Sequence, residues 1–193
     1  MFLKLLIHVL YAFRQQIVDG FIHRVLVIAP LRVARDTWPA EIQKWDHLKG
    51  LTWSVAVGTA QERLAALRQK TFLHIINREH VQWLIEDSGL RWEYDLIVID
   101  ELSSFKSHQA KRFRALIRMR PRVARVVGLT GTPSSNGLMA LWAEFRLLDM
   151  GKRLGRFLTH YREAFFLPDR RSAQPVFPWK PKPGPEDDIY PPI

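Results

Sequence analysis

Two adjacent carboxylates, Asp100 and Glu101, come directly after the apolar run at residues 96–99. An apolar run of this length is typical of a buried strand, and ligands of an open parallel sheet bind beyond the carboxyl ends of its strands. At such an end Asp100 could hold a magnesium ion, while Glu101 could orient and deprotonate an attacking water. A strand that stops at two surface acids is also common, so this pair alone leaves both interpretations open.

A second group of residues suited to chemistry follows another apolar run, at residues 125–129. That run ends in Thr130, Gly131, Thr132 and Pro133. Hydroxyl groups and a glycine at a strand end let the backbone approach a phosphate or a neighbouring loop closely. A plain tight turn uses the same residue types. The combination with the Asp-Glu pair nevertheless favours one site built from two strand ends.

The elements that would position these residues alternate along the chain. Strands are predicted at residues 25–29, 53–57, 72–76, 96–99 and 125–129, and helices at residues 38–45, 60–70, 78–87, 109–119 and 138–148. Strict alternation of this kind predicts an α/β fold, with a parallel sheet covered by helices on both faces. The sequence therefore predicts a three-layer domain.

Positive charge is concentrated in one segment of the chain. The formal net charge is +10, and residues 102–143 contain eight lysines and arginines with no acidic residue. Such a field favours a polyanionic partner, with nucleic acid first and an anionic membrane surface second. A solvated helix face is the open alternative.

The two ends of the chain differ from its centre. The apolar N-terminal stretch is interrupted by Lys4 and His8, and it falls short of the ~20 residues that span a bilayer. Leucines at helical spacing predict a helix over residues 3–18 instead, with no membrane anchor. Eight of the twelve prolines lie between Pro168 and Pro192, which predicts a tail or linker without regular structure. The absence of cysteine excludes disulfides and thiolate zinc sites, and it fits a reducing cytoplasm.

The motif pair DE and LTGTP resembles motifs II and III of superfamily-two (DEAD/DEAH-like) helicases. The continuation through Asn136 to Trp142, and the upstream segment VLVIAPLRVARDTWPAEIQKW, resemble the Swi/Snf-like branch of DNA-stimulated ATPases and translocases. Within that branch the chain is most similar to the compact helicases of bacteriophages and prophages. The resemblance covers residues 24–166 and implies a RecA-like first lobe in the cytoplasm of a bacterium or phage-infected host.

The resemblance also implies roles for particular residues. ATP with magnesium would be the cofactor, and DNA would be bound through its backbone, irrespective of base sequence. Asp100 and Glu101 match the acids that bind magnesium and activate water. The residues matched to coupling between nucleotide and DNA are Thr130, Gly131 and Thr132, and those matched to DNA contacts are Pro30, Leu31, Arg32, Asn77, Arg78 and Asn136. Ser103 departs from the histidine that is usual at its position in motif II.

One expected motif is absent from the 193 residues, namely the phosphate-binding loop G-x-x-x-x-G-K-[ST]. The nearest mimic, at residues 150–153, lacks the hydroxyl residue and follows a predicted helix rather than a strand. The resemblance therefore implies a domain division of residues 1–23 (helix after the missing loop), 24–167 (first lobe) and 168–193 (tail or linker). The sheet would be incomplete at its N-terminal edge, and the second RecA-like lobe would lie outside the chain.

These absences predict negligible ATP hydrolysis by the isolated chain. Three alternatives stay open. The chain could be a non-catalytic, basic nucleic-acid-binding module. The missing loop and lobe could come from a partner such as a neighbouring gene product. The chain could also be a degraded product that folds poorly and self-associates.

Overall fold

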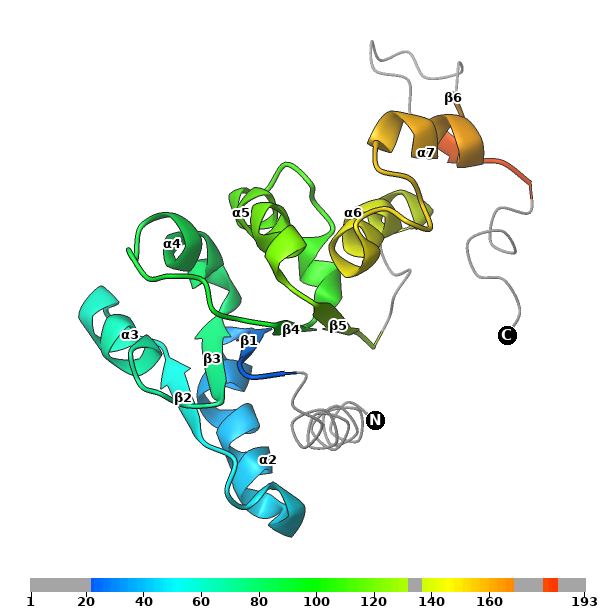
Figure 1. Cartoon of the computed structure of the whole chain (residues 1–193). Coiled ribbons are helices and arrows are strands. Elements are labelled where there is room, and N and C mark those ends of the chain that lie inside the picture. The colour runs from blue at the N-terminus through cyan, green and yellow to red at the C-terminus, as the bar shows by residue number, and fades with distance from the viewer. Residues whose placement is uncertain (1–21, 132–136, 169–178, 184–193) are drawn as a thin grey trace.

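Five parallel strands form the central sheet of the protein, whose computed structural model describes residues 22–131, 137–168 and 179–183. The strand order is β2-β3-β1-β4-β5, and every neighbouring pair is parallel (Figure 1). The strands are β1 (Val25–Ala29), β2 (Trp53–Ala56), β3 (Leu73–Asn77), β4 (Leu96–Asp100) and β5 (Arg125–Leu129). The predicted parallel sheet is confirmed, and each predicted strand lies within one residue of its observed bounds.

The three central strands β3, β1 and β4 are buried along their whole length. Their apolar runs are continuous rather than alternating because helices cover both of their faces. Strand β1 lies between the other two, with Val25 aligned to Leu73 on one side and to Leu96 on the other. Strands β2 and β5 are the two edge strands of this sheet.

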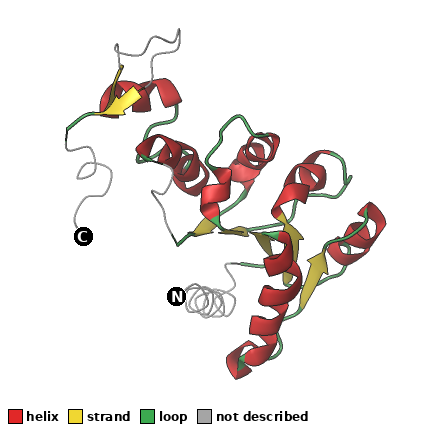
Figure 2. Ribbon diagram, turned by 180° about the vertical axis from the view of Figure 1, so that it is seen from behind, coloured by secondary structure: helices red, strands yellow, loops and turns green. Residues whose placement is uncertain are grey.

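Successive side chains of each strand point to opposite faces, and they divide the core into two clusters. On one face Leu26 and Ile28 pack with α3 (Ala60–Leu67), α4 (Val81–Glu86), α5 (Lys111–Met119) and α6 (Leu138–Asp149). On the other face Val25 and Val27 pack with α2 (Trp38–Lys44). Figure 1 shows this division, and the reverse view in Figure 2 shows it again. The predicted three-layer arrangement is confirmed.

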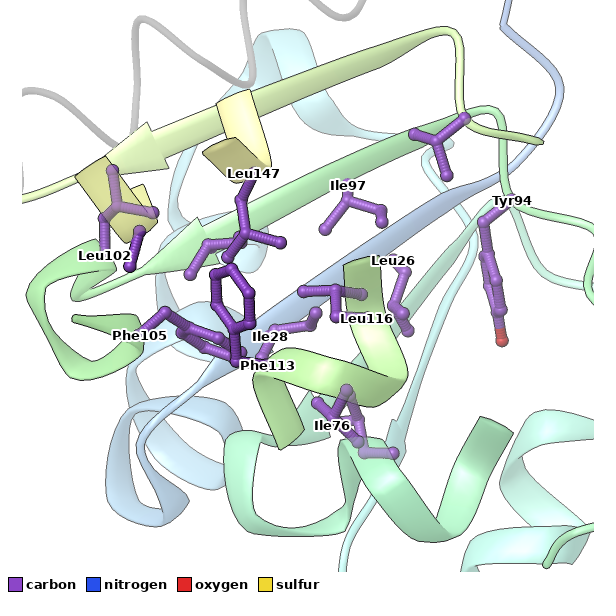
Figure 3. Close-up of a cluster of buried hydrophobic side chains, with 14 of the residues drawn as sticks. Leu26, Ile28, Ile76, Tyr94, Ile97, Leu102, Phe105, Phe113, Leu116 and Leu147 are labelled. Carbon is purple, nitrogen blue, oxygen red and sulfur yellow. The ribbon is translucent and has the colours of Figure 1, made fainter. Parts of the chain in front are cut away.

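The larger cluster gathers around α5. Figure 3 shows Phe113 and Leu116 of α5 directed toward Ile28 of the sheet, with Phe105 beside them. All four side chains are at least 96% buried. Removal of a buried phenylalanine side chain costs about 3–5 kcal/mol, so this contact fixes α5 firmly on the sheet.

Two helix predictions differ from the structure by three residues at one end, and the other three agree within two residues. The helix expected over residues 78–87 is split into a 3-10 turn, η3 (Arg78–His80), and α4. The helix expected over residues 60–70 ends at Leu67. Its start is fixed by a capping box in which Thr59 Oγ1 accepts from the Glu62 amide and Glu62 Oε2 accepts from the Thr59 amide.

The C-terminal part contains structure that the sequence analysis did not predict. Helix α7 (Leu158–Phe165) leads into β6 (Phe166–Pro168), which pairs antiparallel with β7 (Trp179–Pro181). The expectation of no regular structure after residue 167 is therefore wrong at Pro168 and at residues 179–181. Prolines are tolerated here because they lie at strand ends in a two-stranded edge pairing. Tyr161 anchors α7 by donating a hydrogen bond of 2.6 Å to the Leu138 carbonyl at the start of α6.

The helix predicted over residues 3–18 lies outside the described residues. Within the described ranges, no helix has both the length and the apolar character that a membrane crossing requires.

Candidate functional site

The sequence-predicted residues meet where the five parallel strands end, at an edge that we call the carboxyl edge. Asp100 lies opposite Leu129 in the pairing of β4 with β5, so Thr130 follows the residue beside Asp100. Ala29 lies opposite Asn77 in the pairing of β1 with β3. The structure thus brings together the ends of four strands, with the residues Asp100, Glu101, Thr130, Gly131, Pro30, Leu31, Arg32, Asn77 and Arg78. Thr132 and Asn136 lie outside the described residues.

Asp100 is buried, with 1% of its surface exposed. Its Oδ2 accepts a hydrogen bond of 2.9 Å from the indole Nε1 of Trp38. Its Oδ1 is buried and has no hydrogen-bond partner within the described part of the chain. Burial raises the pKa of Asp100, the Trp38 hydrogen bond opposes that rise, and the charge of Glu101 adds to it.

Asp100 Oδ1, unpartnered within the described ranges, suits a magnesium ion. Magnesium prefers carboxylate oxygens, usually from one or two side chains, and completes its shell with waters and substrate phosphates. An orphaned, buried carboxylate oxygen at a strand end fits that requirement. The described residues contain no group of three or more potential metal ligands. Asp100 is thus the residue that would hold the ion, with Glu101 beside it.

Glu101 begins the turn that follows β4 and has a left-handed backbone conformation, with φ of 62° and ψ of 64°. The hydroxyl of Ser103 donates a hydrogen bond to Glu101 Oε1, and the Ser104 amide donates to the Glu101 carbonyl at 2.9 Å. Ser103 therefore holds the carboxylate from the position where the motif usually has histidine. The left-handed conformation is rare for a residue with a side chain and costs about 1–2 kcal/mol.

A third acid, Glu144 of α6, was missed by the sequence analysis. It is 98% buried, and burial together with the charge of Glu101 raises its pKa to about 7, although Lys106 opposes the rise. Its Oε1 has no hydrogen-bond partner among the described residues. The sequence held a signal for it, because Glu144 is spaced three residues from both Leu141 and Leu147 and so shares their buried helix face.

Gly128 of β5 permits close packing behind the Asp-Glu turn. A Cβ at this position would lie 2.5 Å from Leu102 Cδ2 and 3.2 Å from Leu148 Cδ2. Leu102 directly follows Glu101 and is buried. The glycine therefore lets the turn that carries the carboxylates lie against β5.

The loops predicted to contact DNA differ in how accessible they are. Leu31 is 45% exposed and Arg32 is also exposed, at the start of the helical segment that continues into η1 (Val33–Thr37). By contrast Asn77 is buried, and its Oδ1 accepts from the Glu79 amide at 3.4 Å. Arg78 donates to Glu79 Oε1 at 3.2 Å. The loop after β1 is therefore more accessible to a DNA backbone than the loop after β3.

Part of the basic segment is used within the fold. Arg112 pairs with Glu79, and Arg118 pairs with Glu86. Arg120 is buried and donates hydrogen bonds to the carbonyls of Val123, Leu147 and Leu148. Fewer of the eight positive charges in this segment are therefore available to a partner than the sequence alone suggested.

Comparison with known proteins places this geometry in a family. The SNF2-related domain family matches residues 3–168 of the chain. Protein p41 of Acyrthosiphon pisum secondary endosymbiont phage 1 is 40% identical over 147 residues, which cover 73% of this chain and 32% of that protein. Helicase ssl-1 of Caenorhabditis elegans is 32% identical over 132 residues, which cover 64% of this chain and 5% of that protein.

A solved structure supports the fold. The Sulfolobus solfataricus SWI2/SNF2 ATPase core in complex with dsDNA superposes with a TM-score of 0.71 at 24% identity, covering 86% of this chain and 33% of that one. The chain thus spans about a third of the phage relative and of this structure. The sheet is the RecA-like sheet expected from the resemblance, and the chain belongs to the SNF2-related domain family.

Proposed function

We propose that the chain is the first RecA-like lobe of a phage-type, ATP-dependent DNA translocase or helicase. The observation that carries the proposal is the pairing of Asp100 with Leu129, because it sets the two carboxylates beside Thr130 at one edge of the sheet. A nucleotide with its magnesium ion binds at such an edge in open α/β sheets. The family match and the helicase among the relatives support the same reading.

The residues of the site divide the work of hydrolysis. Bound ATP with magnesium would supply the phosphoryl group and the charge that polarises it. Asp100 Oδ1, which has no other partner among the described residues, would hold the ion, while the Trp38 indole fixes the other oxygen. Glu101 would orient and deprotonate water, and Ser103 fixes the direction of its carboxylate.

DNA would lie along the same edge. Leu31 and Arg32 are exposed there, and an arginine with nearby backbone amides can neutralise phosphates without reading bases. Asn77, Arg78 and Asn136 would add contacts from the neighbouring loops, and Thr130, Gly131 and Thr132 would couple the nucleotide to the DNA. The solved structure of the Sulfolobus solfataricus core in complex with dsDNA supports duplex DNA as the partner.

The 193 residues alone should hydrolyse ATP negligibly. They contain no G-x-x-x-x-G-K-[ST] loop, so the triphosphate charge would meet Asp100 and Glu101 without a compensating lysine or amide nest. A partner that supplies this loop and the second RecA-like lobe should restore turnover.

Duplex binding by the 193-residue chain tests the DNA assignment. We expect sequence-independent binding whose salt slope falls by about 0.9 in Arg32→Ala, as one phosphate contact is lost. Arg156→Ala removes another exposed charge, from the segment after α6, and should leave the slope unchanged. Equal effects of the two variants would contradict the placement of DNA at the carboxyl edge.

Nucleotide addition separates a motor lobe from a simple binding module. If the site holds a nucleotide, magnesium-ATP should change the affinity for duplex DNA, and Glu101→Gln should alter that change. A nucleotide-dependent affinity would count against the non-catalytic module. DNA-stimulated turnover by the chain alone, lost in Glu101→Gln, would refute the expected inactivity.

A further inference from the structure

A cavity of about 410 Å³ lies at the opposite end of the strands from the carboxyl edge. Arg24 and Tyr94, which line it, stand just before β1 and β4, while Leu67 and Met119 are the last residues of α3 and α5. We call this cavity the amino-edge pocket. Its volume falls in the range of about 300–1,000 Å³ that is usual for pockets that bind small molecules.

The rim of the amino-edge pocket is strongly cationic. Five of its lining residues are basic: Arg24, Arg68, Lys70, Arg91 and Arg122. The one acid among the lining residues, Glu93, pairs with Arg24. The other four cations are exposed and form no ion pair with any residue in the described ranges. Arg112 and Arg118 of α5, by contrast, pair with glutamates, so the rim gathers these four unpaired cations around one cavity.

The floor of the amino-edge pocket is apolar. Leu67 and Leu84 are buried, and Trp92 stacks edge-on against Tyr94 with ring centroids 5.1 Å apart. The Tyr94 hydroxyl lies 2.7 Å from His74 Nδ1, and His74 Nε2 lies 3.1 Å from the Gln69 carbonyl. A carbonyl can only accept, so Nε2 carries the proton and the Tyr94 hydroxyl donates to Nδ1. The buried Tyr94 hydroxyl is thus satisfied internally. The partly buried side chains of Ile85, Leu90 and Trp92 supply the apolar surface that a ligand can contact, and Trp92 Nε1 has no hydrogen-bond partner among the described residues.

The direction of the helices decides which anion suits the amino-edge pocket. Helices α3, α4 and α5 end at it, so carbonyl groups and the negative ends of the helix dipoles surround it. A small phosphate seated deep inside would meet these carbonyls instead of the amide groups found at helix N-termini. Carboxylates held out at the rim would meet the arginine and lysine heads, while an apolar side chain would contact the floor.

We propose that the amino-edge pocket docks an acidic peptide segment of a protein partner, with one apolar side chain as its anchor. The strands that separate it from the carboxyl edge have five residues, or about 16 Å at 3.3 Å per residue. A partner at this pocket and a nucleotide or DNA at the carboxyl edge can therefore be bound together. The proposal goes beyond the proposed function and does not depend on it.

Fluorescence anisotropy with a labelled synthetic peptide tests the proposal. The probe alternates Asp and Glu around one central Leu, and the protein is the full 193-residue chain. We expect saturable binding that weakens about tenfold or more in the double variant Arg91→Glu/Arg122→Glu, because attraction at the rim becomes repulsion. Arg114→Glu reverses an exposed charge of α5 that does not line the pocket, and it should weaken binding much less.

Peptide variants keep the test independent of protein folding. Replacing the central Leu by Ser should weaken binding several-fold, because the apolar floor loses its ligand. Failure of the Leu peptide to bind, equal losses in the rim variant and in Arg114→Glu, or indifference to the Leu-to-Ser change would each overturn the proposal. Full displacement of the peptide by inorganic phosphate or by a short DNA duplex would assign the pocket to phosphate ligands and overturn it as well.

Discussion

The indole of Trp38 holds Asp100 through a hydrogen bond of 2.9 Å between Nε1 and Oδ2. The two residues are 62 positions apart, and both are at most 1% exposed. Through this bond α2, which packs on one face of the sheet, positions the carboxylate at the end of β4. The hydrogen bond favours the charged form of Asp100, whereas burial disfavours it.

Trp38→Phe should lower the free energy of unfolding by about 2 kcal/mol or more, because a buried hydrogen bond to a charged group is lost. Urea denaturation measures the change. Trp45→Phe is the matched control, since its indole donates to Glu41 Oε2 at 3.0 Å but is only half-buried, and it should cost less. In an Asp100→Asn background, where the acceptor is neutral, the Trp38→Phe loss should shrink. Equal losses in both backgrounds would contradict this account.

The left-handed conformation of Glu101 predicts an unusual preference for glycine. Glu101→Gly should be more stable than Glu101→Ala by about 1 kcal/mol, because glycine adopts positive φ without steric cost. Both variants remove the contact with Ser103, so the difference between their free energies of unfolding reports the cost of the backbone conformation. At Ala65, an exposed position within α3, glycine should instead be less stable than alanine. If glycine were less stable than alanine at both positions, the backbone strain at Glu101 would be refuted.

Arg120→Met should destabilise the protein by about 2–4 kcal/mol, because three carbonyl groups lose a buried, charged donor. Arg118→Met removes an exposed arginine of the same segment and should cost less than about 1 kcal/mol, as surface ion pairs contribute little. Thermal or chemical denaturation of the two variants checks the contrast. Similar losses would mean that the three hydrogen bonds of Arg120 contribute no more than a surface ion pair.

Glu144 predicts a pH dependence of stability. Its pKa is raised from the usual 4.5 to about 7 in the folded protein, so the folded state retains a proton that the unfolded state releases. Between those two values the wild-type stability should therefore fall as the pH rises. Glu144→Gln removes this slope. Above pH 7 the variant should be more stable, by roughly 3 kcal/mol at most, and below pH 4 the two should converge.

Equilibrium unfolding across that pH range measures the effect. Glu163→Gln makes the same chemical change at an exposed site of α7 and should leave the slope as in the wild type. A Glu144→Gln variant with an unchanged slope would show that another group titrates in this window.

Much of the fold followed from local pattern, whereas contacts between distant segments did not. The strands and the meeting of Asp100 with Thr130 at one edge were predictable, because buried parallel strands have continuous apolar runs and their ends share an edge. The Ser103 contact, the burial of Glu144 and the hydrogen bonds from Arg120 to Leu147 and Leu148 depend on packing between elements. The pairing of β6 with β7 joins two short segments that are separated in the sequence and lack a strand-like apolar pattern. The functional roles of the site residues stay predictions.

Because all five strands run in one direction, the two edges of the sheet carry different groups. The carboxyl edge carries the acids and loops of the proposed nucleotide site, and the opposite edge carries helix C-termini and cations that lack an ion pair among the described residues. Substitutions at the amino-edge pocket would therefore alter the proposed peptide contact and leave Asp100, Glu101 and the loops of the carboxyl edge in place.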